Sequence, residues 1–122
     1  MKQASVLFAV LALAAASAHA GKLSCGKTST GEFASTSKCS YSGTSLADAY
    51  AAVRAAGHTT DHMPKTLPAK NTQRHIDEDT VVITKWQGRQ KVSVCEENAA
   101  EYCVILKQNK GRVAIQYIDA SP

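Results

Sequence analysis

Cysteine placement constrains the fold of this chain more than any other feature of its sequence. The 122 residues contain four cysteines, Cys25, Cys39, Cys95 and Cys103, and all of them follow an N-terminal stretch with the layout of an export signal. An even number of cysteines in a small exported chain favours two disulfides. We favour the local pairs Cys25–Cys39 and Cys95–Cys103, and the long-range pairings stay open. A zinc site is the weaker alternative, because the chain has no Cys-x-x-Cys motif.

The first 20 residues predict a secretory signal peptide. Lys2 gives a positive start, the run from Val6 to Ala16 is apolar, and Ala18-His19-Ala20 is a small-x-small cleavage site. The apolar run is too short to span a bilayer. We therefore expect residues 1–20 to be removed, and residues 21–122 to form a single disulfide-stapled domain. We expect that domain to be secreted as a monomer that makes no membrane contact.

One segment, SLADAYAAVRAAG at residues 45–57, predicts a helix clearly. Ser45 is a favoured N-cap residue and Gly57 a favoured C-terminal stop. Apolar residues recur at helical spacing between them, and the alanines favour helix and allow close packing. We expect Leu46 and Val53 to face a sheet and Arg54 to be solvated.

The second half of the chain predicts strands, because Val, Ile and Tyr alternate with polar residues between turn signals. The predicted strands cover 80–87, 91–95, 102–108 and 112–118. Residues 21–41 predict a short stapled hairpin that turns near Thr30 and Gly31, and the polar residues 58–79 predict a long loop. The predicted fold class is α+β, with an N-terminal hairpin and one α-helix packed on an antiparallel sheet of about four strands.

Several segments, in this order, resemble the small secreted guanine-specific ribonucleases of fungi. The resemblance rests on "SCG", "CSYSGTSLADAYAAVRAAG", "TLPAKN" and "YCVILKQNKGRVAIQYIDAS", which together cover most of the chain after the signal peptide. It implies a microbial-ribonuclease-like fold. It also implies a catalytic set made of a glutamate base, a histidine acid on the last hairpin, an arginine beside the phosphate and a histidine in the proline loop.

The catalytic set of those enzymes is missing from the matching positions. Transphosphorylation needs a proton acceptor, a proton donor and a cation around the phosphate, but the positions hold Tyr117, Ala69 and Cys103. No glutamate lies in residues 80–87. The only later glutamates, Glu96, Glu97 and Glu101, are expected in a turn. We therefore expect no catalytic residue, which makes the chain similar to the ribonuclease-like effectors of plant-pathogenic fungi that act by binding.

Basic residues around two predicted turns form the candidate binding surface. The first turn carries Lys85, Trp86, Arg89 and Lys91, and the second carries Lys107, Lys110 and Arg112. If both turns lie at one end of the sheet, the cations could contact RNA phosphates and Trp86 could stack on a base. The other reading is that the lysines are simply solvated and that Trp86 belongs to the core.

Histidines offer two further candidate sites. His58 and His62 have the spacing of a metal pair, but they follow the helix and do not lie on it. His75 could act with Asp77 or Glu78 in a rearranged ribonuclease site, although nothing in the sequence positions them. We therefore expect no metal and no cofactor.

Three functions fit these features. The first is a secreted, non-enzymatic effector, a virulence factor that binds a host protein or host RNA, and the second is a secreted ribonuclease with a rearranged active site. The third is a small antimicrobial or killer-type toxin, which the size, disulfides and net charge of +4 also permit. The sequence leaves open whether a secreted effector would go on to enter host cells.

Overall fold

The structure of the chain is a computed structural model that describes residues 21–31 and 34–120. The predicted signal peptide, residues 1–20, lies outside the described residues. Within the described part, no helix is long and apolar enough to cross a membrane.

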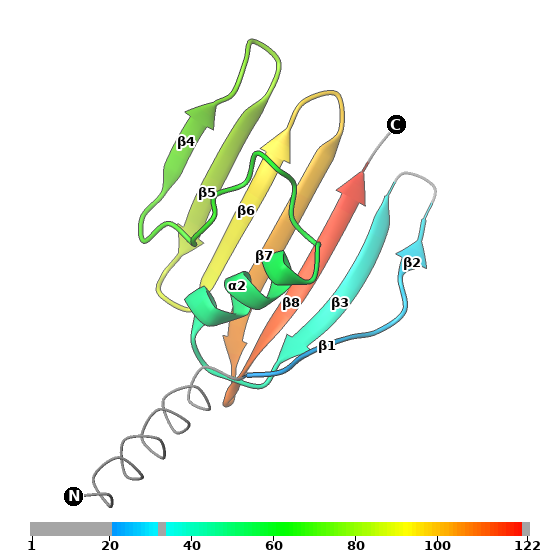
Figure 1. The fold of residues 1–122 in the computed structure, drawn as a ribbon, viewed down its shortest axis with the longest axis vertical. Coiled ribbons are helices and arrows are strands. Elements are labelled where there is room, and N and C mark those ends of the chain that lie inside the picture. Colours follow the sequence, from blue (N-terminus) through cyan, green and yellow to red (C-terminus); the bar gives the residue numbers. More distant parts are fainter. Residues whose placement is uncertain (1–20, 32–33, 121–122) are drawn as a thin grey trace, which may run out of the picture.

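The described residues form one antiparallel sheet and one helix (Figure 1). The sheet order is β1-β3-β8-β7-β6-β5-β4, and the short strand β2 also pairs with β3. The elements are β1 (Leu23–Cys25), β2 (Ser29–Thr30), β3 (Ser35–Tyr41), α2 (Leu46–Ala55), β4 (Thr72–His75), β5 (Val81–Gln87), β6 (Lys91–Glu97), β7 (Glu101–Asn109) and β8 (Arg112–Ala120).

The predicted α+β fold, with one helix on a ribonuclease-like sheet of about four strands, is wrong, whereas the predicted N-terminal hairpin is present because β1 and β2 pair with β3. The protein is mostly β, with one short helix on an eight-stranded antiparallel sheet. β3 pairs with β8 from Ser35↔Asp119 to Tyr41↔Val113, so the N-terminal segment continues the sheet. At the opposite edge, β4 pairs with β5, where the sequence predicts only a loop. The four predicted C-terminal strands themselves are confirmed as β5 to β8.

Helix α2 forms where the sequence predicts it. The Ser45 hydroxyl accepts a hydrogen bond from the Asp48 N–H at 3.2 Å, which caps the first turn. Leu46 and Val53 are buried against the sheet, as expected. Arg54 is partly buried, and its guanidinium lies 3.5 Å from the Pro64 carbonyl oxygen, so the expectation that it is solvated is wrong.

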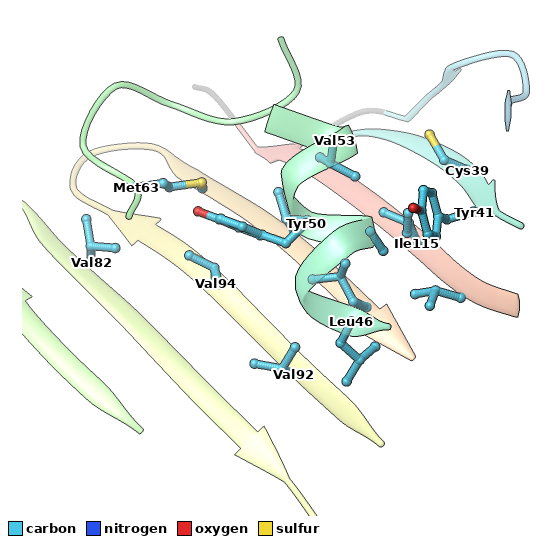
Figure 2. Packing of buried hydrophobic residues seen from close by; sticks show 14 residues of the cluster. Cys39, Tyr41, Leu46, Tyr50, Val53, Met63, Val82, Val92, Val94 and Ile115 are labelled. Atoms are coloured by element: carbon cyan, nitrogen blue, oxygen red, sulfur yellow. The ribbon is translucent and has the colours of Figure 1, made fainter. Parts of the chain in front are cut away.

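The core lies between the sheet and a layer made of α2 and the segment that follows it. Figure 2 shows Tyr50 reaching from the helix toward Met63, above Val94 of β6. Tyr50 is fully buried, and its hydroxyl donates to the Pro64 carbonyl at 2.6 Å. A buried phenol needs such a partner, so this bond fixes the loop after the helix over the sheet.

The two disulfides join the predicted local pairs. Cys25 and Cys39 lie directly opposite each other on β1 and β3, and Cys95 lies opposite Cys103 on β6 and β7. The prediction of two local disulfides is therefore confirmed. Both bridges cross neighbouring strands, so they staple the sheet near one edge and near its centre.

Candidate binding face of the sheet

One face of the sheet is covered and the other is not. Successive side chains of a strand point to opposite faces, so Val104 and Leu106 of β7 point into the core while Ile105 and Lys107 point away from it. In Figure 1, α2 and the loop after it lie on the same side of the sheet. No described element covers the other side, which we call the open face.

The two basic turns lie side by side at one end of the sheet. The backbone N–H of Gln108 donates to the carbonyl of Gln90 at 2.8 Å. Lys91 pairs directly with Lys107, and Asn109 pairs with Arg112 across the second turn. The structure therefore meets the geometric condition on which the predicted basic surface depends.

Most of the predicted basic residues point to the open face, together with two that the sequence analysis missed. Lys85, Lys91, Lys107 and Arg112 alternate with buried residues of their strands, and so does Lys38 of β3. Lys22 lies with Lys110 and Arg112 around a shallow hollow at the same end. We call this cluster the basic end: Lys22, Lys38, Lys85, Lys91, Lys107, Lys110 and Arg112.

Trp86 does not belong to the open face. Its indole N–H donates to the Pro68 carbonyl at 3.0 Å, and its ring packs against the core on the helix side. Arg89 lies with Lys70 and Trp86 around a separate hollow. The prediction that the lysines and a stacking Trp86 share one surface is therefore wrong.

A hollow of about 260 Å³ lies at the centre of the basic end. Ile105 and Ala114 contribute apolar surface to it, and Lys38, Lys91 and Lys107 contribute cations. No aspartate or glutamate of the described part of the chain lines this hollow or the two adjacent hollows beside Lys110 and Arg112. Among the described residues, none of the seven cations of the basic end forms an ion pair.

The opposite end of the open face carries negative charge. Glu97 of β6 pairs directly with Glu101 of β7. Both are strand residues, and so is Glu96 of β6. The expectation that these three glutamates lie in a turn is therefore wrong. Between the two charged ends, the open face carries half-buried apolar side chains, among them Ile83, Ile105 and Ile118. All the described tyrosines and the tryptophan lie on the helix side, so the described part of the open face carries no tyrosine or tryptophan on which a base could stack.

Glu96 is a buried carboxylate that the sequence analysis did not single out. It is 5% exposed on the helix side of β6, and its Oε1 accepts from the Thr60 hydroxyl at 2.6 Å. The His62 Nδ1 lies 3.1 Å from the same oxygen. His62 therefore contacts Glu96, whereas His58 contacts the Cys25 sulfur, so the structure does not bring these two histidines together as a metal pair.

The remaining catalytic candidates lie apart from the basic end. Burial raises the pKa of the Tyr117 phenol above its ordinary value, and Asp119 and Tyr102 raise it further, so it stays protonated near neutral pH. His75 is exposed on edge strand β4, where its Nε2 lies 3.4 Å from the side-chain nitrogen of Gln73. These positions give the cations no adjacent acid and base of the kind that RNA cleavage requires.

Comparison with known proteins gives no family assignment. A scan against protein-family models found no match, and searches of curated proteins and of solved structures found none either.

Proposed function

We propose that this chain is a secreted, non-enzymatic effector that binds host RNA through the basic end of the open face. The observation that carries the proposal is the convergence of seven cations, none with an ion-pair partner among the described residues, at one end of an uncovered sheet face. A cluster of like charges without counterions attracts polyanions. The proposal does not depend on a ribonuclease fold.

The chemistry of the basic end favours contact with the phosphate backbone. Six of its seven cations are lysines, which act as flexible point charges, and the surface has no stacking aromatic in its described part. Base stacking and edge contacts provide sequence selectivity, whereas phosphate contacts provide affinity without it. We therefore expect binding that tolerates many sequences and weakens steeply as salt is added.

Binding without cleavage agrees with the placement of the titratable groups. Glu97 and Glu101, two carboxylates that the structure describes on the open face, lie at the end opposite the cations. Tyr117 lies on the other side of the sheet. In the proposal the chain acts as a secreted monomer whose rigid sheet presents the cations, and no step needs a general acid, a metal or a cofactor.

Fluorescence anisotropy with labelled single-stranded RNA tests the proposal. The variant with both Lys91→Glu and Lys107→Glu should bind at least about tenfold more weakly at low salt. The slope of log K against log salt should become about 1.4 units shallower, because each phosphate contact on a single strand contributes about 0.7. The RNA should remain intact throughout.

A matched control carries the same charge change on the other side of the sheet. Lys65 and Lys70 are exposed in the loop after the helix, and Lys70 lies beside Trp86. The variant with Lys65→Glu and Lys70→Glu should bind RNA nearly as well as the unmodified chain. Equal loss in both double variants would contradict the assignment to the basic end. Cleavage of the RNA would support the rearranged-ribonuclease alternative, and binding to host protein with no RNA affinity would also overturn the proposal.

A further inference from the structure

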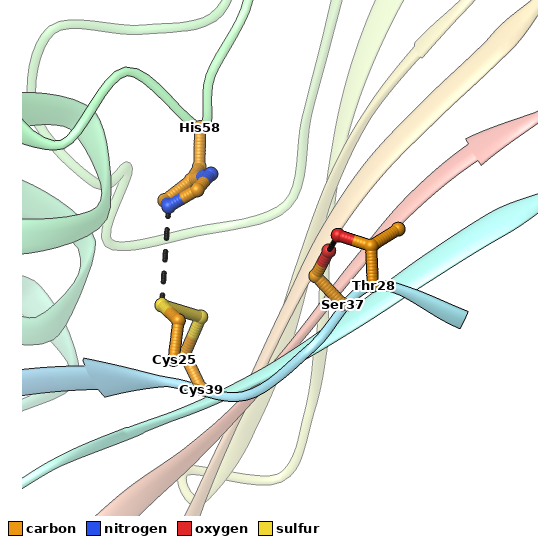
Figure 3. Close-up of a disulfide and its surroundings, with 5 residues drawn as sticks. All are labelled: Cys25, Thr28, Ser37, Cys39 and His58. Carbon is orange, nitrogen blue, oxygen red and sulfur yellow. Dashed lines mark hydrogen bonds between the residues drawn. A yellow bond between two sulfur atoms is a disulfide. The ribbon is translucent and has the colours of Figure 1, made fainter. Parts of the chain in front are cut away.

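We propose that Cys25, Cys39 and His58 form a latent zinc site that opens when the Cys25–Cys39 disulfide is reduced. Figure 3 shows the His58 ring above this bridge. Its Nε2 lies 3.8 Å from the Cys25 sulfur, and one ligand atom from each of the three residues lies within 4.8 Å of the others. The inference is independent of RNA binding, because the cluster lies on the helix side of the sheet.

The backbone holds His58 in this position. Gly57 has a positive φ of 83° at the C-terminal end of α2 and its N–H donates to the Arg54 carbonyl at 3.0 Å. The N–H of His58 then donates to the Val53 carbonyl at 3.1 Å. This is the pair of hydrogen bonds that closes a helix with a left-handed glycine. The imidazole also packs against Tyr117, with ring centroids 5.6 Å apart.

The pairing of β1 with β3 places the two cysteines opposite each other, in addition to the disulfide that joins them. They are directly opposed residues in the antiparallel pairing of β1 with β3. In a tetrahedral zinc site with Zn–S bonds of about 2.3 Å and Zn–N bonds of about 2.0 Å, neighbouring ligand atoms lie about 3.5–3.8 Å apart. The Nε2 of His58 lies 3.8 Å from the Cys25 sulfur, close to these distances. After reduction, rotation of the cysteine side chains must separate the two sulfur atoms.

Formation of the site requires a two-electron reductant, and a thiol of the glutathione class would supply the electrons in a reducing compartment. Two such thiols give two electrons and two protons to the protein disulfide and leave as their own disulfide. The products on the protein are two thiols, whose protons are released when Zn²⁺ binds the thiolates. Cys25 is exposed, so the attacking thiolate can reach its sulfur. Water would supply the fourth ligand.

The second disulfide offers a comparison within the same chain. Among the described residues, Cys25, Cys39 and His58 form the one group of three or more potential metal ligands that lie this close together, and no histidine joins Cys95 and Cys103. Reduction of both bridges should therefore create one zinc site and not two. In an oxidising compartment the first bridge staples β1 to β3, and in a reducing compartment Zn²⁺ would hold the same strands together.

Metal titration of the chain from Gly21 onward tests this inference. Co²⁺ is the spectroscopic probe and Zn²⁺ is its competitor. After reduction by a phosphine, the chain should bind one Co²⁺ with thiolate-to-metal charge-transfer and tetrahedral d–d absorption. The oxidised chain should show neither band. His58→Ala should weaken the affinity at least tenfold, because loss of even an outer-shell partner costs about 10–100-fold.

Two further variants separate ligation from folding. His58→Cys supplies another soft ligand and should retain the charge-transfer absorption, whereas His75→Ala removes an exposed histidine of β4 and should change nothing. Absence of both bands in the reduced chain would overturn the proposal. So would His58→Ala with unchanged affinity, or the binding of two metal ions per chain.

Discussion

Lys91 of β6 lies directly opposite Lys107 of β7, and both side chains point to the face of the sheet that no described element covers. Like charges that face each other across a pair of strands destabilise the sheet. This placement therefore works against stability, and the proposed binding of a polyanion would give it a function.

Reversal of one of these charges should separate stability from binding. Lys107→Glu replaces a like-charge pair by an opposite-charge pair across β6 and β7, so we expect it to stabilise the fold by about 0.2–1 kcal/mol. The same change should weaken RNA binding. Urea unfolding and RNA anisotropy on the same sample measure the two effects. Lys107→Gln, which only removes the repulsion, should give a smaller gain in stability, and a net loss of stability in both variants would contradict this reading.

The buried face of α2 should dominate the stability of the helix layer. Leu46 is 6% exposed, and Leu46→Ala should lower the free energy of unfolding by about 2–5 kcal/mol. Arg54→Ala loses one weak contact to the Pro64 carbonyl and should cost about 1 kcal/mol or less. Equal shifts of the urea midpoint in these two variants would show that the packing of the helix is different.

Glu96 should hold the loop after the helix on the sheet. Glu96→Ala leaves the Thr60 hydroxyl without its 2.6 Å acceptor in a partly buried site, so we expect a loss of about 1–3 kcal/mol. Glu96→Gln keeps an acceptor oxygen and should lose less. The neighbouring Glu97 lies on the open face opposite Glu101, so Glu97→Ala serves as the control and should be close to neutral. Hydrogen exchange of residues 58–64 should rise in Glu96→Ala alone.

Asp77 should contribute to the acid sensitivity of the turn between β4 and β5. The N–H of Asp79 donates a hydrogen bond to the Asp77 carboxylate, and so does Thr80. These bonds, the one from Asp79 most of all, lower the pKa of Asp77 below the usual value. Because the folded pKa is the lower one, this contribution is fully present above about pH 3.9, the unfolded value. It is lost as the pH falls through the folded pKa. Asp77→Asn should flatten that acid limb of the stability curve in urea unfolding, and an unchanged limb would contradict the assignment.

Local features of the fold could be predicted from the sequence, and its long-range pairing could not. The helix and the last four strands carry clear apolar periodicity, which is why their positions are confirmed. β4 reads TQRH and all of its residues are exposed, so it has no apolar pattern to reveal it. β3 reads STSKCSY, and the sequence alone does not show that it pairs with β8, more than 70 residues away.

In the candidate site too, local features could be predicted from the sequence and long-range contacts could not. Alternation within β6 and β7 is local, so the sequence could indicate that Lys91 and Lys107 flank adjacent turns. Lys38 reaches the same surface only through the pairing of β3 with β8, where it lies opposite Gln116. The sequence also could not show that the Pro68 loop covers Trp86 on the other side of the sheet, because that contact joins residues 18 positions apart.

Lysine footprinting tests the central claim of RNA binding at the basic end most directly. The protein is acetylated with and without single-stranded RNA at low salt, and the modification of each lysine is measured by mass spectrometry. RNA should protect Lys38, Lys91 and Lys107 and leave Lys65 and Lys70 as reactive as in the free protein. Protection of Lys65 and Lys70 with no change at Lys91 and Lys107, or no protection anywhere, would contradict the account.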